Sequence, residues 1–227
     1  MKITVLIPAY NEEQNIKPTI DGVRNIPRYL PPELKWQIIV VDDGSTDNTA
    51  DQAARCAVQT VRLEQNIGKG GALRYGLRQA KGDIILFLDA DLRASANEAH
   101  KLVRPLLANE ADVSIAKFKP APQAGGFGFV KALAAAGVKY YTGRELTAVL
   151  SGQRAFTRQV LTTIGPLPDG FGLEVGMLID ILNQGYRVLE VETEMEHDVT
   201  GRNWSGFVHR GTQFLQIAKL LLTKSKE

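Results

Sequence analysis

Three short, almost continuously apolar runs constrain the fold of this chain more than any other feature. They lie at residues 3–7, 38–41 and 84–88 and are rich in isoleucine and valine. Strands that are apolar on both faces are typical of parallel sheets that helices cover on each side. Helix-like segments separate the runs, as in strand–helix–strand crossover units. The sequence therefore predicts an α/β fold with a mostly parallel central sheet and helices on both faces.

Further strands and helices are expected from the spacing of apolar residues and from turn residues. Helices are expected at residues 49–57, 71–80, 97–108, 129–141, 172–183 and 204–219, and strands at residues 112–117, 148–156 and 186–195. With 227 residues, 44% of them hydrophobic, the chain can bury one substantial core. No repeat or change in composition marks a second unit, so we expect residues 1–227 to form a single domain.

Each of the three apolar runs ends at a cluster of polar residues. The clusters are Asn11–Glu13, Asp42–Ser45 and Asp89–Asp91. In an open α/β sheet, ligands bind outside the carboxyl ends of the strands. We therefore expect the three clusters to converge on one site.

Asp89 and Asp91 place two carboxylates at the end of the third run, separated by Ala90. Hard oxygen donors at this spacing suit Mg²⁺ or Mn²⁺, which keep open positions for the phosphate oxygens of a substrate. The alternative is a solvated turn in which Asp91 caps the next helix.

Residues 66–71 open a predicted helix with three glycines and Lys69. Backbone N–H groups, a helix N-terminus and one cation can together hold a phosphate. The segment is not a Walker loop, because Gly70 replaces the Ser or Thr that follows Gly-Lys, and it lacks the glycine spacing of dinucleotide-binding dehydrogenases. In the preceding cluster, Asp42 can accept a hydrogen bond from a base N–H or can start the following helix.

Composition excludes several classes of protein. Lys and Arg number 27 against 25 Asp and Glu, and this net charge of +2 does not indicate a surface for nucleic acid. The one cysteine, Cys56, cannot form an intrachain disulfide or a zinc cluster, and we expect it to be buried as a small apolar side chain. No run approaches the length of a membrane span and no signal peptide is recognisable, so we expect a cytoplasmic protein.

Four segments carry a resemblance to a known family. They are ITVLIPAYNEE at residues 3–13, VVDDGSTDNT at 40–49, NIGKGGA at 66–72 and GDIILFLDADL at 82–92. In this order they resemble the nucleotide-sugar motifs of family-2 glycosyltransferases of the GT-A fold. The resemblance implies a nucleotide-sugar-binding half at residues 1–92 in which the binding residues are Pro8, Ala9, Tyr10, Glu12, Asp42, Lys69, Asp89, Ala90 and Asp91. Asp42 at the base-reading position favours UDP, with GDP left open.

The second half of the chain is similar to glucosyl-3-phosphoglycerate synthases and related transferases. The similarity lies in Gly143-Arg144 with Thr147, in residues 151–155 and 170–180, and in His197. It implies an acceptor half at residues 93–197, followed by a helical tail at 198–227, and a metal site of Asp91, His197 and Asp89. By this similarity an anionic acceptor is held by Gly143, Arg144 and Thr147, and its hydroxyl by Glu174. The chain has one residue more between Arg144 and Thr147 than is expected of those synthases.

Several of these residues also have a purely structural interpretation. The segment around Arg154 is similar to polyprenyl-phosphate sugar transferases, whose arginine would meet the lipid phosphate. A guanidinium fork suits a phosphate or carboxylate, but Arg144 and Arg154 could equally be structural ion-pair partners. His197 could simply end a strand, and Glu174 could be an exposed helix residue. The glutamates from Glu190 to Glu196 are expected to form the solvated face of an edge strand.

The expected activity is a metal-dependent transfer of a sugar from a donor such as UDP-glucose to a small phosphorylated or carboxylated acceptor such as 3-phosphoglycerate. The expected catalytic residues are Glu174, Asp91 and Lys69. Transfer to a polyprenyl phosphate, a nucleotidyltransferase and a non-catalytic nucleotide-sugar binding module are the alternatives. The apolar run at residues 214–222 is expected in the core or in a homodimer contact, with a peripheral membrane contact as the other interpretation.

Overall fold

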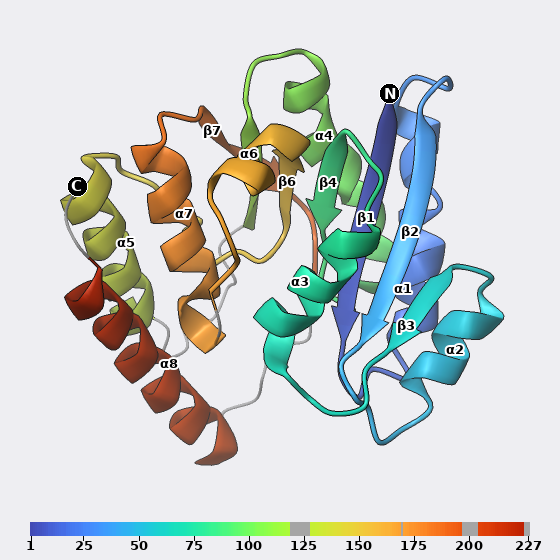
Figure 1. Cartoon of the computed structure of the whole chain (residues 1–227), viewed down its shortest axis with the longest axis horizontal. Coiled ribbons are helices and arrows are strands. Elements are labelled where there is room, and N and C mark those ends of the chain that lie inside the picture. Colours follow the sequence, from blue (N-terminus) through green and yellow to red (C-terminus); the bar gives the residue numbers. More distant parts are fainter. Residues whose placement is uncertain (119–127, 169, 197–203, 225–227) are drawn as a thin grey trace.

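The central element of the fold is one seven-stranded sheet (Figure 1). The computed structural model describes residues 1–118, 128–168, 170–196 and 204–224, without the side chains of Phe171 and of residues 204–213. The strand order is β3-β2-β1-β4-β6-β5-β7. The strands are β1 (Lys2–Ala9), β2 (Lys35–Asp42), β3 (Gln59–Arg62), β4 (Ile84–Phe87), β5 (Val113–Phe118), β6 (Arg154–Thr157) and β7 (Val188–Thr193).

Most neighbouring strands run parallel, as predicted. Strand β2 is parallel to both of its neighbours, β3 and β1. Strand β1 is also parallel to β4, and β5 is parallel to β7. β6 runs antiparallel to both β4 and β5, between which it lies. The three apolar runs are β1, β2 and β4, whose central residues are completely buried. The expected α/β class is therefore confirmed.

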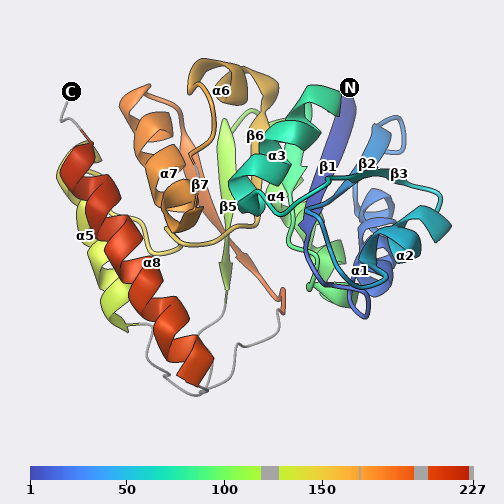
Figure 2. The same cartoon turned by 60° about the horizontal axis from the view of Figure 1, so that its bottom comes forward.

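Helices cover both faces of the sheet (Figures 1 and 2). One face packs against α1, α2 and α4, and the other against α3, α5, α6, α7 and α8. The helices are α1 (Ile16–Val23), α2 (Thr49–Arg55), α3 (Gly68–Gln79), α4 (His100–Leu107), α5 (Gly128–Thr142), α6 (Arg158–Thr163), α7 (Leu173–Asn183) and α8 (Trp204–Thr223). Short 3-10 turns lie at η1 (Ile26–Tyr29), η2 (Arg93–Ala99) and η3 (Gly170–Gly172).

The structure differs from the sequence-based expectation in five places. The elements α1, β3 and α6 were not predicted, because each is short and has no long periodic apolar pattern. The strand expected at residues 148–156 is confined to Arg154–Thr157, since residues 148–151 form a turn in which Ser151 N–H donates to the Ala148 carbonyl at 3.0 Å. The helix expected at residues 97–108 is split into η2 and α4.

The helix α8 packs along α5 and against the start of α7 (Figure 2). Its Ile217 is buried in the core, whereas Leu215 and Leu222 are exposed. Close approach depends on small residues, since a Cβ at Gly137 would lie 2.5 Å from the Leu221 side chain. Part of the run at 214–222 thus belongs to the core, as expected. A search of the described residues finds no helix with the length and apolar character needed to cross a membrane.

Candidate functional site

The loops after β1 and β2 are joined at the carboxyl edge of the sheet. Asn11 adopts a left-handed backbone conformation, with φ of 56°. Its N–H donates to Ser45 Oγ and its Oδ1 accepts from Thr46 N–H, both at 2.9 Å. Glu12 N–H donates to Thr49 Oγ1 at 2.7 Å. Two of the three polar clusters are therefore in direct contact, as the strand pattern predicted.

The four residues predicted to hold the nucleoside at the end of β1 lie on this edge. Ala9 is buried, and the side chain of Tyr10 is exposed. Pro8 pairs in register with Val41 of β2. Glu12 Oε2 accepts from Asn15 Nδ2 at 2.7 Å, which turns its carboxylate toward the start of α1.

Asp42 ends β2 with a fully buried side chain. Its Oδ2 lies 3.6 Å from Arg62 Nε, and neither carboxylate oxygen accepts a hydrogen bond from the described residues. Burying a charged oxygen without a hydrogen-bond donor is costly, and native structures rarely leave such groups unsatisfied. Asp42 is thus suited to accept an N–H from a bound ligand.

Asp43 has a role that sequence reasoning did not assign. Its two carboxylate oxygens accept from the N–H groups of Ile67 at 2.9 Å and Gly68 at 2.8 Å. Burial raises the pKa of the Asp43 carboxyl, while these hydrogen bonds oppose the rise. The carboxylate fixes the N-terminus of α3 and so places Lys69. The second acid of the Asp-Asp pair at the end of β2 was the available signal.

Lys69, Asp89 and Glu174 form an ionic cluster that joins three separate elements. Lys69 Nζ, on α3, lies 2.6 Å from Asp89 Oδ1 after β4 and 3.3 Å from Glu174 Oε1 in the first turn of α7. Burial works against the charge of Lys69, but the two carboxylates outweigh it and hold the pKa of the ammonium above its usual value. The cluster therefore keeps one positive charge between the two halves of the chain that are predicted to bind the donor and the acceptor.

Gln153 and Gly152 complete the surroundings of Asp89. Gln153 Nε2 donates to Asp89 Oδ2 at 2.6 Å, and its Oε1 accepts from Asp89 N–H at 2.9 Å. A Cβ at Gly152 would lie 2.4 Å from Lys69 Nζ. The segment before β6 is therefore in contact with the ionic cluster.

The predicted metal ligands Asp89 and Asp91 both lie on the turn after β4. Ala90 between them is buried, and its carbonyl accepts from Thr19 Oγ1 at 2.7 Å. His197 lies outside the described residues. In the part of the chain that is described, no three His, Cys, Asp or Glu side chains are grouped as a metal site. The two carboxylates nevertheless fit a hard divalent cation as donors, with further ligands from outside this group.

Arg154 is bound to backbone carbonyls. Its side chain is completely buried and donates from Nε to the Ser151 carbonyl at 2.8 Å, and from its two terminal nitrogens to the carbonyls of Glu174 and Val149 at 3.0 Å. Burial lowers the pKa of Arg154 to about 10, against the opposing charge of Glu174. A guanidinium engaged in this way holds the backbone together, which favours the structural interpretation of Arg154, and its contact with an acceptor anion stays a prediction.

The predicted acceptor residues at 143–147 follow α5. Gly143 has φ of 70° and ends the helix, and Arg144 is exposed. Thr147 is already engaged, since its N–H and hydroxyl donate to the Glu190 carboxylate at 2.5 Å and 2.8 Å. Ala148 N–H also donates to Glu190. Glu190 is therefore an anchor for this loop, not only part of a solvated strand face.

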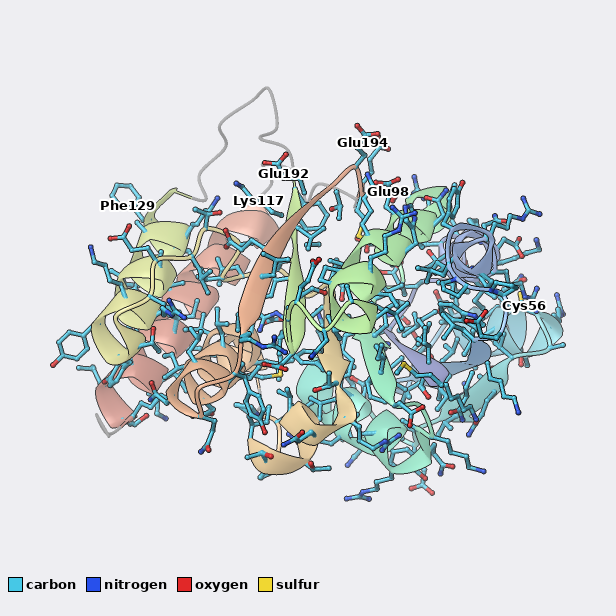
Figure 3. All side chains as sticks on the ribbon, turned by 90° about the horizontal axis from the view of Figure 1, so that it is seen from above. Cys56, Glu98, Lys117, Phe129, Glu192 and Glu194 are labelled. Atoms are coloured by element: carbon cyan, nitrogen blue, oxygen red, sulfur yellow. The ribbon has the colours of Figure 1, made fainter. Side chains whose placement is uncertain are left out.

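The remaining glutamates of this strand behave as expected of an exposed edge. Glu192 Oε1 lies 3.6 Å from Lys117 Nζ, near the carboxyl ends of β7 and β5 (Figure 3). The N–H of Glu194 donates to the carboxylate of Glu98 at 3.2 Å. Cys56 is buried, as predicted for the one cysteine of the chain.

Comparisons with known proteins agree with one another. The family model described as glycosyl transferase family 2 matches residues 4–161. A glucosyl-3-phosphoglycerate synthase of Mycobacterium tuberculosis is 34% identical over 203 residues, which cover 80% of this chain and 61% of the relative. The chain thus spans less than two thirds of that relative's length. A dolichyl-phosphate beta-glucosyltransferase of Trichomonas vaginalis is 36% identical over 45% of this chain and 33% of that protein.

Solved structures give the same result over nearly the whole chain. A glucosyl-3-phosphoglycerate synthase of M. tuberculosis in complex with Mn²⁺, UDP and phosphoglyceric acid superposes with a TM-score of 0.79. It is 29% identical, and the match covers 98% of this chain and 78% of the other. The structure of that enzyme with Mn²⁺, UDP-glucose and phosphoglyceric acid gives a TM-score of 0.77.

Proposed function

Because this chain belongs to glycosyl transferase family 2, we propose that it transfers glucose from UDP-glucose to 3-phosphoglycerate with Mn²⁺ or Mg²⁺ as cofactor. The fold is the expected GT-A nucleotide-sugar transferase fold. The observation that carries the proposal is the ionic cluster of Lys69, Asp89 and Glu174, which brings a cation from the donor half beside a carboxylate of the acceptor half. The similar enzymes whose structures contain UDP-glucose and phosphoglyceric acid support the choice of substrates.

The donor nucleotide would lie on the edge formed by β1, β2 and β4. Asp42 offers two buried carboxylate oxygens to the N–H of a base, which suits the uracil of UDP. Lys69 is held next to Asp89 and would contact the diphosphate. Because the pKa of Lys69 is raised, the ammonium stays positive through the neutral range and can stabilise the departing phosphate oxygens.

A divalent cation would be held by Asp91 and His197, with Asp89 nearby. Both oxygens of Asp89 already contact the Lys69 ammonium or the Gln153 amide, so we assign the direct contact to Asp91. When bound, the cation neutralises charge that develops on the leaving diphosphate. Asp89 would orient the sugar and the Lys69 ammonium next to this cation.

The acceptor would lie between Glu174 and the loop at 143–147. Glu174 is only 15% exposed and lies beside Lys69, where its carboxylate can accept a hydrogen bond from the attacking hydroxyl and orient it. Arg144 is exposed and offers a guanidinium fork to a phosphate or carboxylate. The Gly143 backbone would complete the contact, together with Thr147, whose hydroxyl donates to Glu190 and can still accept a hydrogen bond. Cytoplasmic location, a homodimer and a peripheral membrane contact stay predictions.

Transfer to a polyprenyl phosphate is the second candidate. It is favoured by the similarity to the dolichyl-phosphate beta-glucosyltransferase, a protein whose name states transfer to a lipid phosphate. Because that similarity extends over only 45% of this chain, it supports this candidate less than the 80% coverage by the glucosyl-3-phosphoglycerate synthase supports the first.

An acceptor panel tests the proposal. The purified chain is incubated with labelled UDP-glucose and Mn²⁺, and with 3-phosphoglycerate, glycerate or undecaprenyl phosphate. We expect label in 3-phosphoglycerate, little in glycerate, and none with the Asp91→Asn variant. Transfer to undecaprenyl phosphate alone would establish the second candidate, and transfer to none of the phosphorylated acceptors would contradict both.

A further inference from the structure

The amide of Gln153 contacts Asp89 at two points. It accepts from the Asp89 backbone N–H at 2.9 Å and donates to Asp89 Oδ2 at 2.6 Å. A backbone N–H can only donate, so the Gln153 oxygen must face it and the Gln153 nitrogen must face the carboxylate. The orientation of the amide therefore follows from the contacts themselves.

This double contact determines which oxygen of Asp89 remains for Lys69. With Oδ2 bound to the Gln153 amide, Oδ1 faces the Lys69 ammonium at 2.6 Å. Gln153 holds the backbone and the carboxylate of Asp89 at the same time, which leaves the side chain little rotational freedom. The neutral amide of Gln153 thus orients the charged carboxylate of Asp89.

Gln153 is itself held rigidly. The residue is 3% exposed, and its backbone carbonyl accepts from the N–H of Ala116 in β5 at 2.9 Å. The next residue, Arg154, fixes the preceding turn by donating to the Ser151 carbonyl. Gly152 provides the space in which Lys69 reaches Asp89. A rigid support of this kind is what preorganisation of a charged site requires.

We propose that Gln153 is a positioning residue that orients the Asp89 carboxylate, and through it the Lys69 ammonium, for the diphosphate and metal of the donor. The inference rests on the proposed function, because it takes this edge of the sheet as the donor site. Gln153 itself touches neither substrate nor metal in this account.

The first test measures UDP affinity by calorimetry, with and without Mn²⁺, for the whole chain and two variants. Gln153→Met keeps the length of the side chain but removes both hydrogen bonds. Gln37→Met is the matched control, because Gln37 also links neighbouring segments, through Thr4 Oγ1 and Lys81 N–H, but at the opposite ends of the strands.

We expect Gln153→Met to reduce the gain in UDP affinity that Mn²⁺ provides by about tenfold, the loss typical of a hydrogen bond to a charged group. UDP affinity without metal should fall by a smaller factor, because Lys69 also contacts the diphosphate in this account. Gln37→Met should lower Tm without changing the gain from Mn²⁺. The proposal is overturned if Mn²⁺ increases the UDP affinity of Gln153→Met as much as that of the wild type, while Tm falls as in Gln37→Met. That result would show a merely structural role of Gln153.

A second readout needs neither nucleotide nor metal. Hydrogen exchange of the Asp89 backbone amide should be faster in Gln153→Met than in the wild type, and unchanged in Gln37→Met. Equal exchange in wild type and Gln153→Met would overturn the positioning role. A wild-type protein whose UDP affinity does not respond to Mn²⁺ would count against the proposed function, and the amide exchange would then decide the role of Gln153 by itself.

Discussion

Lys69 is the residue on which the two halves of the site meet. It lies on α3 and contacts carboxylates from the turn after β4 and from α7, residues that are 20 and 105 positions away in the printed sequence. One ammonium between two carboxylates leaves a net negative charge, which suits a site that receives a divalent cation. Substitutions next to this cluster should therefore affect ligand binding before they affect folding.

Gly152→Ala should displace Lys69 from Asp89. The new Cβ would lie 2.4 Å from Lys69 Nζ, and the far end of a lysine side chain can move where a backbone cannot. We expect a Tm close to that of the wild type, with UDP-glucose binding at least fivefold weaker because about 1 kcal/mol of a charged contact is lost. Thermal unfolding and calorimetry on the same preparation check this, and unaltered binding would contradict the contact.

Arg154→Met should act on stability. Removing the guanidinium takes away the donors of three backbone carbonyl contacts, two of them buried, so we expect the free energy of unfolding to fall by about 3 kcal/mol or more. Arg144→Met, at an exposed arginine, should leave stability unchanged and raise the KM for the anionic acceptor. Denaturant unfolding together with kinetics separates the two arginines. Wild-type stability in Arg154→Met would contradict the structural role.

The sequence indicated the charged residues of the site better than the residues that hold them. Lys69, Asp89 and Glu174 were each predicted from motifs, and the structure brings them together. The roles of Gln153 and Asp43 depend on partners 64 and 24 residues away, and no local pattern records such a contact. The sequence left the role of Arg154 open, because a guanidinium that binds an anion and one that binds carbonyls look the same in a sequence.

At the scale of elements, the edge strand β7 is held by polar contacts at its start and near its middle. At its start, Arg187 forms an ion pair with Asp112, with N···O at 2.9 Å, and donates its backbone N–H to the same carboxylate at 2.8 Å. Further along, Glu190 anchors the loop between α5 and β6. The strand therefore links the sheet to the predicted acceptor loop.

Asp112→Asn should remove stability that depends on pH. The hydrogen bonds and charge of Arg187 hold the pKa of the Asp112 carboxyl below its ordinary value of 3.8. A carboxyl with a depressed pKa in the folded state stabilises the protein above the unfolded value and loses this contribution as the pH falls through the folded value. The wild type should be more stable than the variant at pH 7, and their unfolding free energies should converge below pH 3.8. A constant difference down to the lowest pH would contradict the pairing.

Glu190→Leu should loosen the acceptor loop. It leaves the N–H groups of Thr147 and Ala148 without their acceptor, so we expect the acceptor KM to rise about tenfold while the donor KM is unchanged. Glu190→Gln should restore much of the function, since its amide oxygen can still accept both N–H groups. Glu192→Leu, further along the same strand, is the control. A donor KM that rises together with the acceptor KM would refute this local role.

Which elements could be predicted follows from their burial. The strands β1, β2 and β4 are buried on both faces and stood out as apolar runs. β3 is a four-residue strand with no buried residue, and so gave no pattern. The position of β6 between β4 and β5 could not be read locally, because it pairs with strands that precede it by tens of residues and in the antiparallel sense.

At the scale of the whole molecule, one continuous sheet carries both halves of the site (Figure 1). The net charge of +2 conceals a local arrangement in which acids gather at strand ends around Lys69. The helix α8 packs against α5 and α7. Its Ile217 belongs to the same buried cluster as the apolar residues of α7, the helix that carries Glu174. The helix α8 thus packs behind the part of the chain that is predicted to bind the acceptor.

The central claim is that this edge of the sheet binds a nucleoside diphosphate together with a divalent cation. Thermal unfolding of the whole chain with UDP, in the presence of Mn²⁺ or of a chelator, tests it most directly. We predict that UDP raises Tm only when the cation is present and that Asp91→Ala abolishes the effect. Equal stabilisation by UDP after chelation, or full stabilisation of Asp91→Ala, would contradict the account.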